Sequence, residues 1–430
     1  MTDSINLLDG QYLYMCDYNQ VINACIKDLF LEHGTNRKLT IKDFFINEEL
    51  IKERISTLSQ LIFEASANCN LRCRYCVYNG NYFNQRSLSP DDMSFETARK
   101  GIDYVFSFIR DRKNKDFAIS FYGGEPLLNF KTIKETVRYA KQRFNGWELR
   151  FNMTTNLTLL TGAVLDFLVE NDFSLLVSLD GGQENHDAKR VFPNGNGSHH
   201  MVLKNLEKIK VKYKEFFEKK IGFSSVYSYD LPLKNLYEFF TTHGLVRKKR
   251  VRFSMVNPYH TTYYDRYPKN RAAYRRDFKQ VFLGVLEKIR EGEELSGYET
   301  HLYDNLKDTG DILKTRAFNL LAGACLFDSR LYLDAQGVFH MCEKMNNAFA
   351  FGDVDKGFDI AKMVRIAREF VAVIKDHCLD CNIKFLCTRC YVNFCGDGEF
   401  KLDPDFCQSQ EEYIVRNLEK YIQCKEEGLL

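Results

Sequence analysis

The sequence predicts an α/β fold in which parallel strands alternate with helices. The first observation is a series of apolar runs that favour strands, separated by longer segments with helical spacing. These runs lie at 61–66, 117–122, 148–153, 173–179, 221–227 and 251–255. The second observation is their regular alternation, which is typical of parallel strands joined by helical crossovers. The alternation does not distinguish a barrel-like sheet from an open one.

Residues 1–60 precede this pattern. Residues 8–15 predict a short hairpin around Asp9-Gly10. Residues 19–31 carry apolar side chains at helical spacing. Such a strand–strand–helix segment fits either a small peptide-recognition element or a helical cap on the barrel, and both interpretations stay open.

Residues 61–256 hold the alternating units. The segment after the first strand predicts a helix whose apolar face consists of Phe95, Ala98, Ile102, Val105, Phe106 and Ile109.

Residues 257–320 form a bridging segment rich in Tyr, Arg and Lys, and it is expected to be helical after Arg271. Its composition is typical of a solvated surface, with a partner-binding face as the alternative. Residues 321–430 have few long apolar runs, and eight of the 14 cysteines fall between Cys325 and Cys407. We therefore expect this tail to depend largely on bound metal for its stability.

Composition narrows the function classes. The chain has 430 residues, 45% of them hydrophobic, and a net charge of only +2, so nothing global points to nucleic acid or an anionic membrane. No apolar run is long enough to span a bilayer, and the polar start is not a signal peptide. We expect a cytoplasmic protein with reduced cysteines, whose clustering indicates metal ligation.

Three cysteines, Cys69, Cys73 and Cys76, follow the first predicted strand at C-x3-C-x2-C spacing. Soft sulfur ligands this close on a short loop suit an iron–sulfur cluster or zinc. Three ligands without a nearby fourth leave a position open, which favours a cluster over structural zinc. The alternatives are a zinc knuckle and buried structural cysteines.

Polar motifs also follow the next three predicted strands. They are Gly123-Gly124-Glu125-Pro126, Thr154-Thr155-Asn156 and Ser178-Leu179-Asp180-Gly181, the last followed by His186-Asp187-Ala188-Lys189-Arg190. Paired glycines allow a ligand to approach the backbone, and a glutamate accepts from a cationic amine. Because the carboxyl ends of parallel strands share one edge, these motifs predict an active site there.

This order of motifs resembles the radical S-adenosylmethionine (SAM) enzymes that carry SPASM domains, over residues from about 61 to 410. The resemblance implies a partial (β/α)6 radical SAM barrel with a C-terminal iron–sulfur SPASM domain. It implies a [4Fe–4S] cluster on Cys69, Cys73 and Cys76, with SAM on the open iron.

The same resemblance implies the SAM contacts. Glu125 and the backbone of Gly123 and Gly124 would hold the amino end, and Asn156 and Ser178 would lie near the ribose. Arg190 would pair with the carboxylate, and Tyr75 would flank the cluster and the adenine. His186 is interpreted as a structural residue rather than a ligand.

The tail resembles the SPASM arrangement, which holds two auxiliary [4Fe–4S] clusters. By this resemblance one cluster takes Cys325, Cys342 and Cys390, and the other takes Cys378, Cys381, Cys387 and Cys407. The last gap of the second group is x2 where the family has x3, so Cys395 is an alternative to Cys390. A zinc ribbon is the alternative for the whole tail.

The most similar subgroup comprises maturases that form thioether crosslinks in Cys-rich ribosomal peptides. The resemblance rests on Cys387-Thr388-Arg389-Cys390-Tyr391 and Cys342-Glu343-Lys344. It implies a radical SAM oxidoreductase that abstracts a hydrogen from a Cys-rich precursor peptide, with a flavodoxin- or ferredoxin-like reductant.

Two alternatives remain. One is an anaerobic sulfatase-maturating enzyme, which makes formylglycine. That type has an aspartate where this chain has Glu343. We interpret Glu343 as a surface carboxylate at a turn. A protein of another class, a non-catalytic iron–sulfur or zinc protein that binds nucleic acid, would use Arg247-Lys248-Lys249-Arg250 and the Tyr- and Arg-rich segment as a basic aromatic surface.

Overall fold

The protein is described here from a computed structural model. The structure describes residues 4–16, 20–23, 40–41, 45–82, 85–314, 317–396 and 398–430. No helix within these ranges combines the length and the apolar character needed to cross a bilayer.

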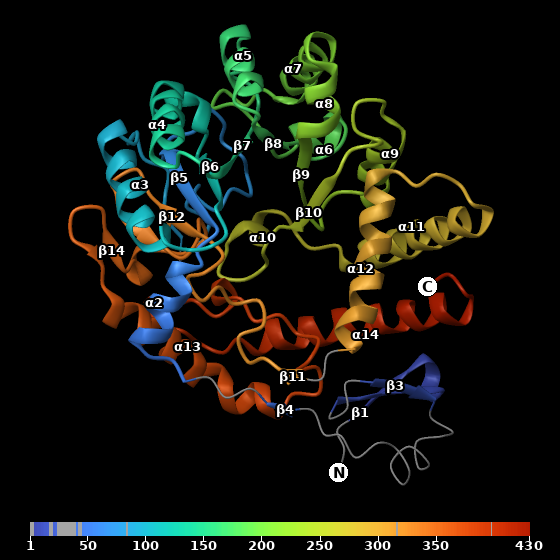
Figure 1. The fold of residues 1–430 in the computed structure, drawn as a ribbon. Helices are drawn as coiled ribbons and strands as arrows, with labels where there is room; N and C mark the ends of the chain where they lie inside the picture. Colours follow the sequence, from blue (N-terminus) through green and yellow to red (C-terminus); the bar gives the residue numbers. More distant parts are fainter. Residues whose placement is uncertain are drawn as a thin grey trace.

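A twisted sheet of eight strands lies at the centre, and its first six strands run parallel in chain order (Figure 1). These six are β5 (Gln60–Ser66), β6 (Asp116–Gly123), β7 (Glu148–Thr155), β8 (Ser174–Ser178), β9 (Ile221–Tyr227) and β10 (Val251–Met255). All six predicted strands are confirmed. The sheet is open, because β10 forms one edge and does not pair back to the other. This resolves the choice that periodicity left open, and it fits a partial barrel.

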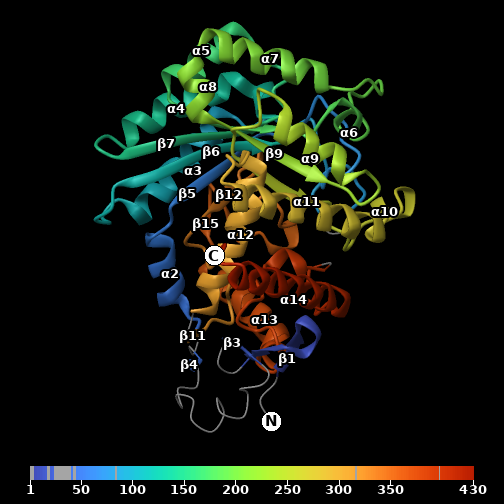
Figure 2. The same ribbon diagram turned by 90° about the vertical axis from the view of Figure 1, so that its right-hand side faces the viewer.

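Helices cover the outer face of this sheet (Figures 1 and 2). They are α3 (Phe95–Ile109), α4 (Phe130–Arg143), α5 (Gly162–Glu170), α6 (Gln183–Asp187), α7 (His199–Lys212), α8 (Lys214–Lys220) and α9 (Leu233–Thr242). In α3 the predicted apolar face is the buried one, with Ala98, Ile102, Val105 and Ile109 inside. The Ser94 hydroxyl begins this helix by accepting from the Thr97 N–H at 3.0 Å.

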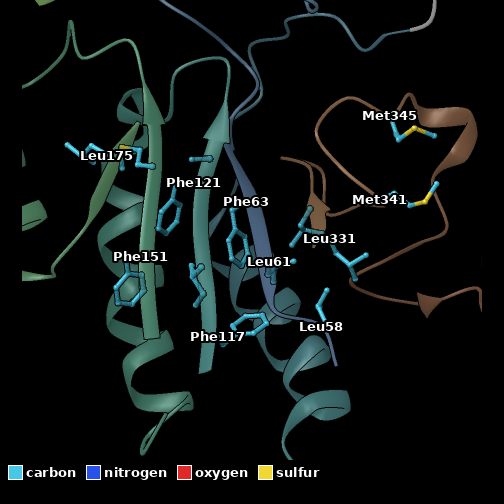
Figure 3. Close-up of a cluster of buried hydrophobic side chains, with 14 of the residues drawn as sticks. Leu58, Leu61, Phe63, Phe117, Phe121, Phe151, Leu175, Leu331, Met341 and Met345 are labelled. Atoms are coloured by element: carbon cyan, nitrogen blue, oxygen red, sulfur yellow. The ribbon is translucent and has the colours of Figure 1, made fainter. Parts of the chain in front are cut away.

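Aromatic side chains of neighbouring strands form the core on one face of the sheet (Figure 3). The rings of Phe63 and Phe121 stack with centroids 6.0 Å apart, and Phe121 stacks on Phe173 at the same distance. Strands β5 and β6 are buried on both faces over most of their length, which is why their sequences read as nearly continuous apolar runs, whereas β7, β8 and β9 alternate buried with less buried residues.

The cysteine-rich tail is joined to this sheet. Strand β12 (Leu331–Leu333) pairs in parallel with β5, and β13 (Phe339–His340) pairs antiparallel with β12. One hydrophobic cluster therefore extends from Ile46 before the barrel to Phe406 in the tail.

The tail contributes its own aromatic packing to this cluster. Its elements are η5 (Asn347–Phe349), β14 (Gly352–Asp353), β15 (Gly357–Phe358), α13 (Ile360–Leu379), η6 (Tyr391–Asn393) and α14 (Pro404–Glu426). Phe370 of α13 packs on Tyr391, Phe394 and Phe400 with ring centroids 4.3 to 5.6 Å apart. The expectation that the tail depends largely on bound metal for its stability stays a prediction beside this packing.

The bridging segment contains α10 (Tyr263–Arg266), α11 (Arg271–Glu291) and α12 (Gly297–Leu313), so the predicted helical character after Arg271 is confirmed. Its tyrosines are not a solvated surface. Tyr263 is 1% exposed, and its ring lies 5.0 Å from that of Tyr264 and 4.8 Å from that of Tyr267. The tyrosines pack on one another and on the cysteine loop.

Two lysines of the basic run at 247–250, which precedes this segment, form ion pairs. Lys249 is 5% exposed and pairs with Glu218 at 3.1 Å, and Lys248 pairs with Glu294 at the same distance. The nucleic-acid alternative loses its main support.

The N-terminal residues form a three-stranded antiparallel sheet of β1 (Ser4–Leu7), β2 (Tyr12–Met15) and β3 (Gln20–Asn23), with η1 (Leu8–Gly10) in the turn between β1 and β2. The hairpin around Asp9-Gly10 is confirmed, with β1 added before it. The predicted helix at 19–31 is wrong for Gln20–Asn23, which are a strand; the rest of it lies outside the described residues.

This sheet covers the tail and not the barrel (Figures 1 and 2). Leu7 and Tyr14 pack with Ile414, Leu418 and Ile422 of α14. The remaining N-terminal elements are β4 (Thr40–Ile41), which pairs with β11 (Ala317–Phe318), and α2 (Glu48–Ser56), which packs on α13.

Candidate functional site

The loop with Cys69, Cys73 and Cys76 follows β5 and is held in place by backbone hydrogen bonds. The Arg72 N–H donates to the Val191 carbonyl at 2.7 Å, and the Arg74 N–H donates to the Lys189 carbonyl at 2.9 Å. The segment after β8 therefore fixes the loop along its length, although the two lie more than a hundred residues apart.

The Gly-Gly-Glu-Pro turn after β6 lies against the start of the same loop. The Gly124 N–H donates to the Ser66 carbonyl at 2.9 Å, and the Glu125 N–H donates to the Asn68 carbonyl at 2.8 Å. Gly123 has φ +126°, a conformation that side chains disfavour. The Gly-Gly-Glu-Pro turn is therefore in backbone contact with the cysteine loop.

The Glu125 carboxylate, predicted to receive the amino end of SAM, is occupied by donors of the chain itself. It accepts from the Thr155 hydroxyl at 2.7 Å, from the Asn156 N–H at 2.7 Å and from the Leu127 N–H at 3.1 Å. Burial raises its pKa to about 7, against the lowering effect of these hydrogen bonds. Glu125 therefore ties the end of β7 to the turn after β6.

Asn156 faces the cysteine loop. Its Nδ2 donates to Asn70 Oδ1 at 2.9 Å and lies 3.9 Å from Cys69 Sγ. Its own Oδ1 accepts from the Thr158 N–H at 2.9 Å and from the Thr158 hydroxyl at 2.7 Å. These hydrogen bonds fix the orientation of the Asn156 side chain beside Cys69.

Arg190 forms a buried ion pair with Asp180. Its Nε lies 2.7 Å from Asp180 Oδ2, while Nη1 lies 4.0 Å from Cys73 Sγ. The Tyr75 hydroxyl donates to the same Asp180 oxygen, and the Arg190 guanidinium lies 5.3 Å from the centre of the Tyr75 ring. The sequence analysis assigns Asp180 no role of its own, yet this residue orients two of the predicted contacts.

These motifs line one cavity of about 170 Å³. Among the predicted contacts, its walls include Cys69, Cys73, Cys76, Gly123, Gly124, Glu125, Asn156, Ser178 and Arg190. Tyr75 is the exception: it is 8% exposed and packs with Val256 and Tyr263 outside this wall.

Sequence reasoning missed Tyr122, Ser224 and Val226, which also line this cavity. The alternation of β9 carried the signal for two of them, since residues at every second position of a strand share a face. The sequence motifs that predict the site come from the carboxyl ends of the strands and do not include these side chains.

The His186 ring is structural, as interpreted from the sequence. It is fully buried, its Nδ1 accepts from the Asp180 N–H at 3.3 Å, and its Nε2 is 2.9 Å from the Ser198 hydroxyl. It fixes the turn that presents Asp180.

The donor set around the cavity fits an iron–sulfur cluster. Burial raises the pKa of Cys69 and of Cys73 to about 12, and Arg190 opposes this rise at Cys73. A bound cationic metal centre would favour the thiolate forms that such burial disfavours. Within the described ranges, no three His, Cys, Asp or Glu side chains are gathered to hold a single metal ion.

Residues 63–217 match the family model described as the radical SAM superfamily. This part of the chain is a radical SAM domain.

Curated relatives share parts of the sequence. The chain is 27% identical over 240 residues to the radical SAM cyclopropyl synthase TigE of Paramaledivibacter caminithermalis, covering 54% of this chain and 48% of that one. It is 33% identical over 165 residues to a cysteine-type anaerobic sulfatase-maturating enzyme of Clostridium novyi, covering 37% and 43%. The chain spans less than half the length of these curated relatives.

Solved structures share the radical SAM fold. A structure of anSMEcpe with bound AdoMet and Kp18Cys peptide has a TM-score of 0.65 at 21% identity, covering 86% of this chain and 99% of that one. A structure of Streptococcus suis SuiB bound to precursor peptide SuiA has a TM-score of 0.52 at 16% identity, covering 89% and 86%.

Beyond the radical SAM domain, the tail cysteines form two groups. Burial raises the pKa of Cys407 to about 12, and the nearby thiols of Cys378, Cys387 and Cys381 add to this effect. Burial raises the pKa of Cys342, and Cys390 and Cys325 add to this effect.

Cys395 contacts polar groups of two other residues. Its Sγ is 3.8 Å from Asn346 Nδ2 and 3.7 Å from the Gly396 carbonyl oxygen. Cys390 lies close enough to Cys325 and Cys342 for their charges to interact, and its choice over Cys395 stays a prediction. Cys16, which the sequence left isolated, donates to the Cys381 carbonyl at 3.3 Å.

Glu343 connects the tail to the cysteine loop. Its carbonyl oxygen accepts from the Tyr78 hydroxyl at 2.7 Å and from Arg86 Nη2 at 2.9 Å. Its carboxylate Oε2 is buried without a hydrogen-bond partner among the described residues. The interpretation of Glu343 as a surface carboxylate is wrong.

Proposed function

We propose that the protein is a radical SAM peptide maturase that forms thioether crosslinks in a Cys-rich ribosomal peptide. The observation that carries the proposal is the division of the tail cysteines into a group of four and a group of three. The group of four is Cys378, Cys381, Cys387 and Cys407; the group of three is Cys325, Cys342 and Cys390. Relatives in fold that bind a precursor peptide or a Cys-containing peptide support a peptide substrate.

The groups that the family uses can be assigned to residues of this chain. Cys69, Cys73 and Cys76 would hold the core [4Fe–4S] cluster, and the cavity wall at Gly123, Gly124, Asn156, Ser178 and Arg190 would hold SAM. When bound, these groups supply the one-electron chemistry that removes a hydrogen atom from an unactivated C–H bond.

The group of three cysteines matters for the substrate. Three thiolates leave a ligand position of a [4Fe–4S] cluster to a donor from outside the chain, and a peptide thiolate is a suitably soft ligand. The contacts of Tyr78 and Arg86 with Glu343 fix Cys342 relative to the core cavity. A sulfur held there would lie in a defined place relative to the carbon that reacts, as crosslinking requires.

The test is anaerobic incubation of the reconstituted protein with SAM, dithionite and a Cys-rich peptide encoded beside its gene. Mass spectrometry should find the loss of two hydrogens per crosslink, and a fragment spectrum in which the linked residues do not separate. A Cys→Ser peptide should form no crosslink. A flavodoxin- or ferredoxin-like protein should replace dithionite as the electron donor.

A second candidate, formylglycine formation, is favoured by the buried Glu343 carboxylate. In sulfatase-maturating enzymes an acidic residue follows the corresponding cysteine, and an unpartnered carboxylate oxygen at this place is a potential proton acceptor. Similarity to a sulfatase-maturating enzyme adds support. A product aldehyde that reacts with hydrazines would establish this reaction and exclude the thioether.

A further inference from the structure

A second, larger cavity of about 780 Å³ lies behind the sheet, between the ends of β9 and β10 and the helices α11, α12 and α14. Figures 1 and 2 show these three helices together beside β10. Its volume falls within the roughly 300–1,000 Å³ that is usual for ligand sites.

Strand β9 lies between this cavity and the cysteine cavity. Ser224 and Val226 of β9 line the cysteine cavity, whereas the adjacent Tyr227 lines the larger one. Successive residues of a strand point to opposite faces, so the two cavities lie on opposite faces of β9. Ser254 of the edge strand β10, which pairs in register with Val226, also lines the larger cavity, so this cavity extends around the edge of the sheet.

The wall of the larger cavity is aromatic, with cations that lack a carboxylate partner. Lys420 Nζ lies 4.1 Å from the centre of the Phe278 ring and 5.4 Å from that of Phe282. Neither Lys420 nor Lys279 has an ion pair within the described part of the chain. By contrast, the acidic Glu412 in this wall is already paired with Arg275 at 2.9 Å and Arg416 at 3.5 Å.

The environment of Lys420 is unfavourable for its charge. Burial lowers its pKa to about 8, the nearby Arg416 adds to this effect, and Glu419 of the same wall opposes it without forming an ion pair among the described residues. An ammonium that is largely removed from water and has no directly bound carboxylate gains more from a carboxylate ligand than an exposed lysine does.

We propose that this cavity binds an acidic segment of the peptide substrate that carries apolar side chains and lies outside the part that reacts. The proposal rests on the proposed peptide-maturase function. The aromatic wall takes the apolar side chains, and Lys420 takes a carboxylate. Binding at this second site holds the peptide while its reactive residue enters the cysteine cavity.

The distribution of polar groups favours a peptide over a fatty acid, which would also combine a carboxylate with an apolar body. Ser254, Asn305, Ser409, Gln410, Asn417 and Gln423 are spread around the wall. Hydroxyl and amide groups at several places can pair with the repeated N–H and C=O groups of a main chain. A fatty acid needs polar partners at one end only.

The test is a selection from a random linear peptide library on the reconstituted full-length protein, followed by fluorescence anisotropy with the recovered peptides. We expect the recovered peptides to combine Asp or Glu with Leu, Phe or Tyr. The Lys420→Met variant should weaken their binding on the order of tenfold or more, as loss of a charge-assisted contact does. Arg276→Gln, which removes an exposed cation of α11 outside the wall, should leave binding unchanged.

The proposal is overturned if the recovered peptides lack acidic residues, if no peptide is recovered, or if Lys420→Met binds them as tightly as the parent protein. It is also overturned if dodecanoate displaces them and binds with equal affinity, which would assign the cavity to a lipid-like ligand. Circular dichroism and iron content verify that the variant is folded. Because binding is measured without turnover, a failure to crosslink any peptide would count against the proposed function and not against this site.

Discussion

The backbone of Gly124 lies so close to Asn68 that a Cβ atom at position 124 would be 2.1 Å from the Asn68 carbonyl oxygen. This contact joins the turn after β6 to the first residue before the cysteine loop. It exists because the Glu125 N–H donates to that same carbonyl. The geometry of the cysteine loop therefore depends on the absence of a side chain at position 124.

The first prediction is that Gly124→Ala displaces the cysteine loop. The added methyl group meets backbone, which cannot rotate away, so we expect a loss of about 1–3 kcal/mol in the free energy of unfolding. SAM affinity, measured by equilibrium binding, should fall with it. Gly284→Ala is the control, since it meets nothing within 4 Å in the interior of α11 and should stabilise the helix by up to about 1 kcal/mol. Equal effects of the two substitutions would contradict the prediction.

The strands of the barrel could be predicted because each is a continuous or alternating apolar run between polar turns, a local property. The bounds of β9 and β10 agree with the prediction at both ends. The motif residues could be grouped because parallel strands end at one edge. Ser178 and Arg190, which the sequence places at that edge, do line the cavity.

Non-local contacts could not be predicted in this way. Strand β12 has only three residues, and its pairing with β5 joins positions about 270 apart. The adjacent apolar residues Val21 and Ile22 are compatible with a helix and with a strand. Backbone pairing with β2 makes this segment a strand. The role of Asp180 depends on Arg190 and Tyr75 meeting it in space.

The second prediction concerns the buried pair of Arg86 and Glu64. Arg86 Nη1 lies 3.5 Å from Glu64 Oε1, both side chains are 9% exposed, and the guanidinium lies 4.5 Å from the centre of the Tyr332 ring. Arg86→Met leaves the Glu64 charge buried without its cation, which should cost roughly 3–5 kcal/mol by chemical denaturation. Adding Glu64→Gln to this variant should restore part of the loss.

The control for this pair is Arg99→Met, which removes an exposed cation bound to Glu96 at 2.7 Å and Asp103 at 3.0 Å. Exposed pairs contribute about 0–1 kcal/mol, so little change is expected. If Arg86→Met cost no more than Arg99→Met, the joint between barrel and tail would not depend on this pair.

The third prediction is a pH dependence of stability at Lys420. Its folded pKa is about 8, below the value of about 10.4 for an unfolded lysine. The unfolded state therefore binds more protons between these values, and the free energy of unfolding should rise as the pH increases from 8 to 10. Allowing for its partial exposure, we expect a contribution of about 1–3 kcal/mol. Lys420→Met should abolish this part of the rise and be more stable than the parent at pH 7. Parallel profiles of the two proteins would show that the ammonium is well solvated.

The last prediction separates Cys390 from Cys395 as ligands of the tail. Beside the larger effect of burial, Cys325 raises the pKa of Cys390, and Cys390 raises the pKa of Cys342. Cys395 contacts Asn346 and the Gly396 carbonyl. Cys390→Ala should therefore lower the iron content by up to about four atoms per chain, as the loss of one [4Fe–4S] cluster would. Cys395→Ala should keep the iron and lose only the packing of a small buried side chain. Iron analysis with Mössbauer spectroscopy of anaerobically reconstituted protein measures both. A loss of iron in Cys395→Ala with full loading of Cys390→Ala would move the ligand to Cys395, and the group of three would have to be redrawn.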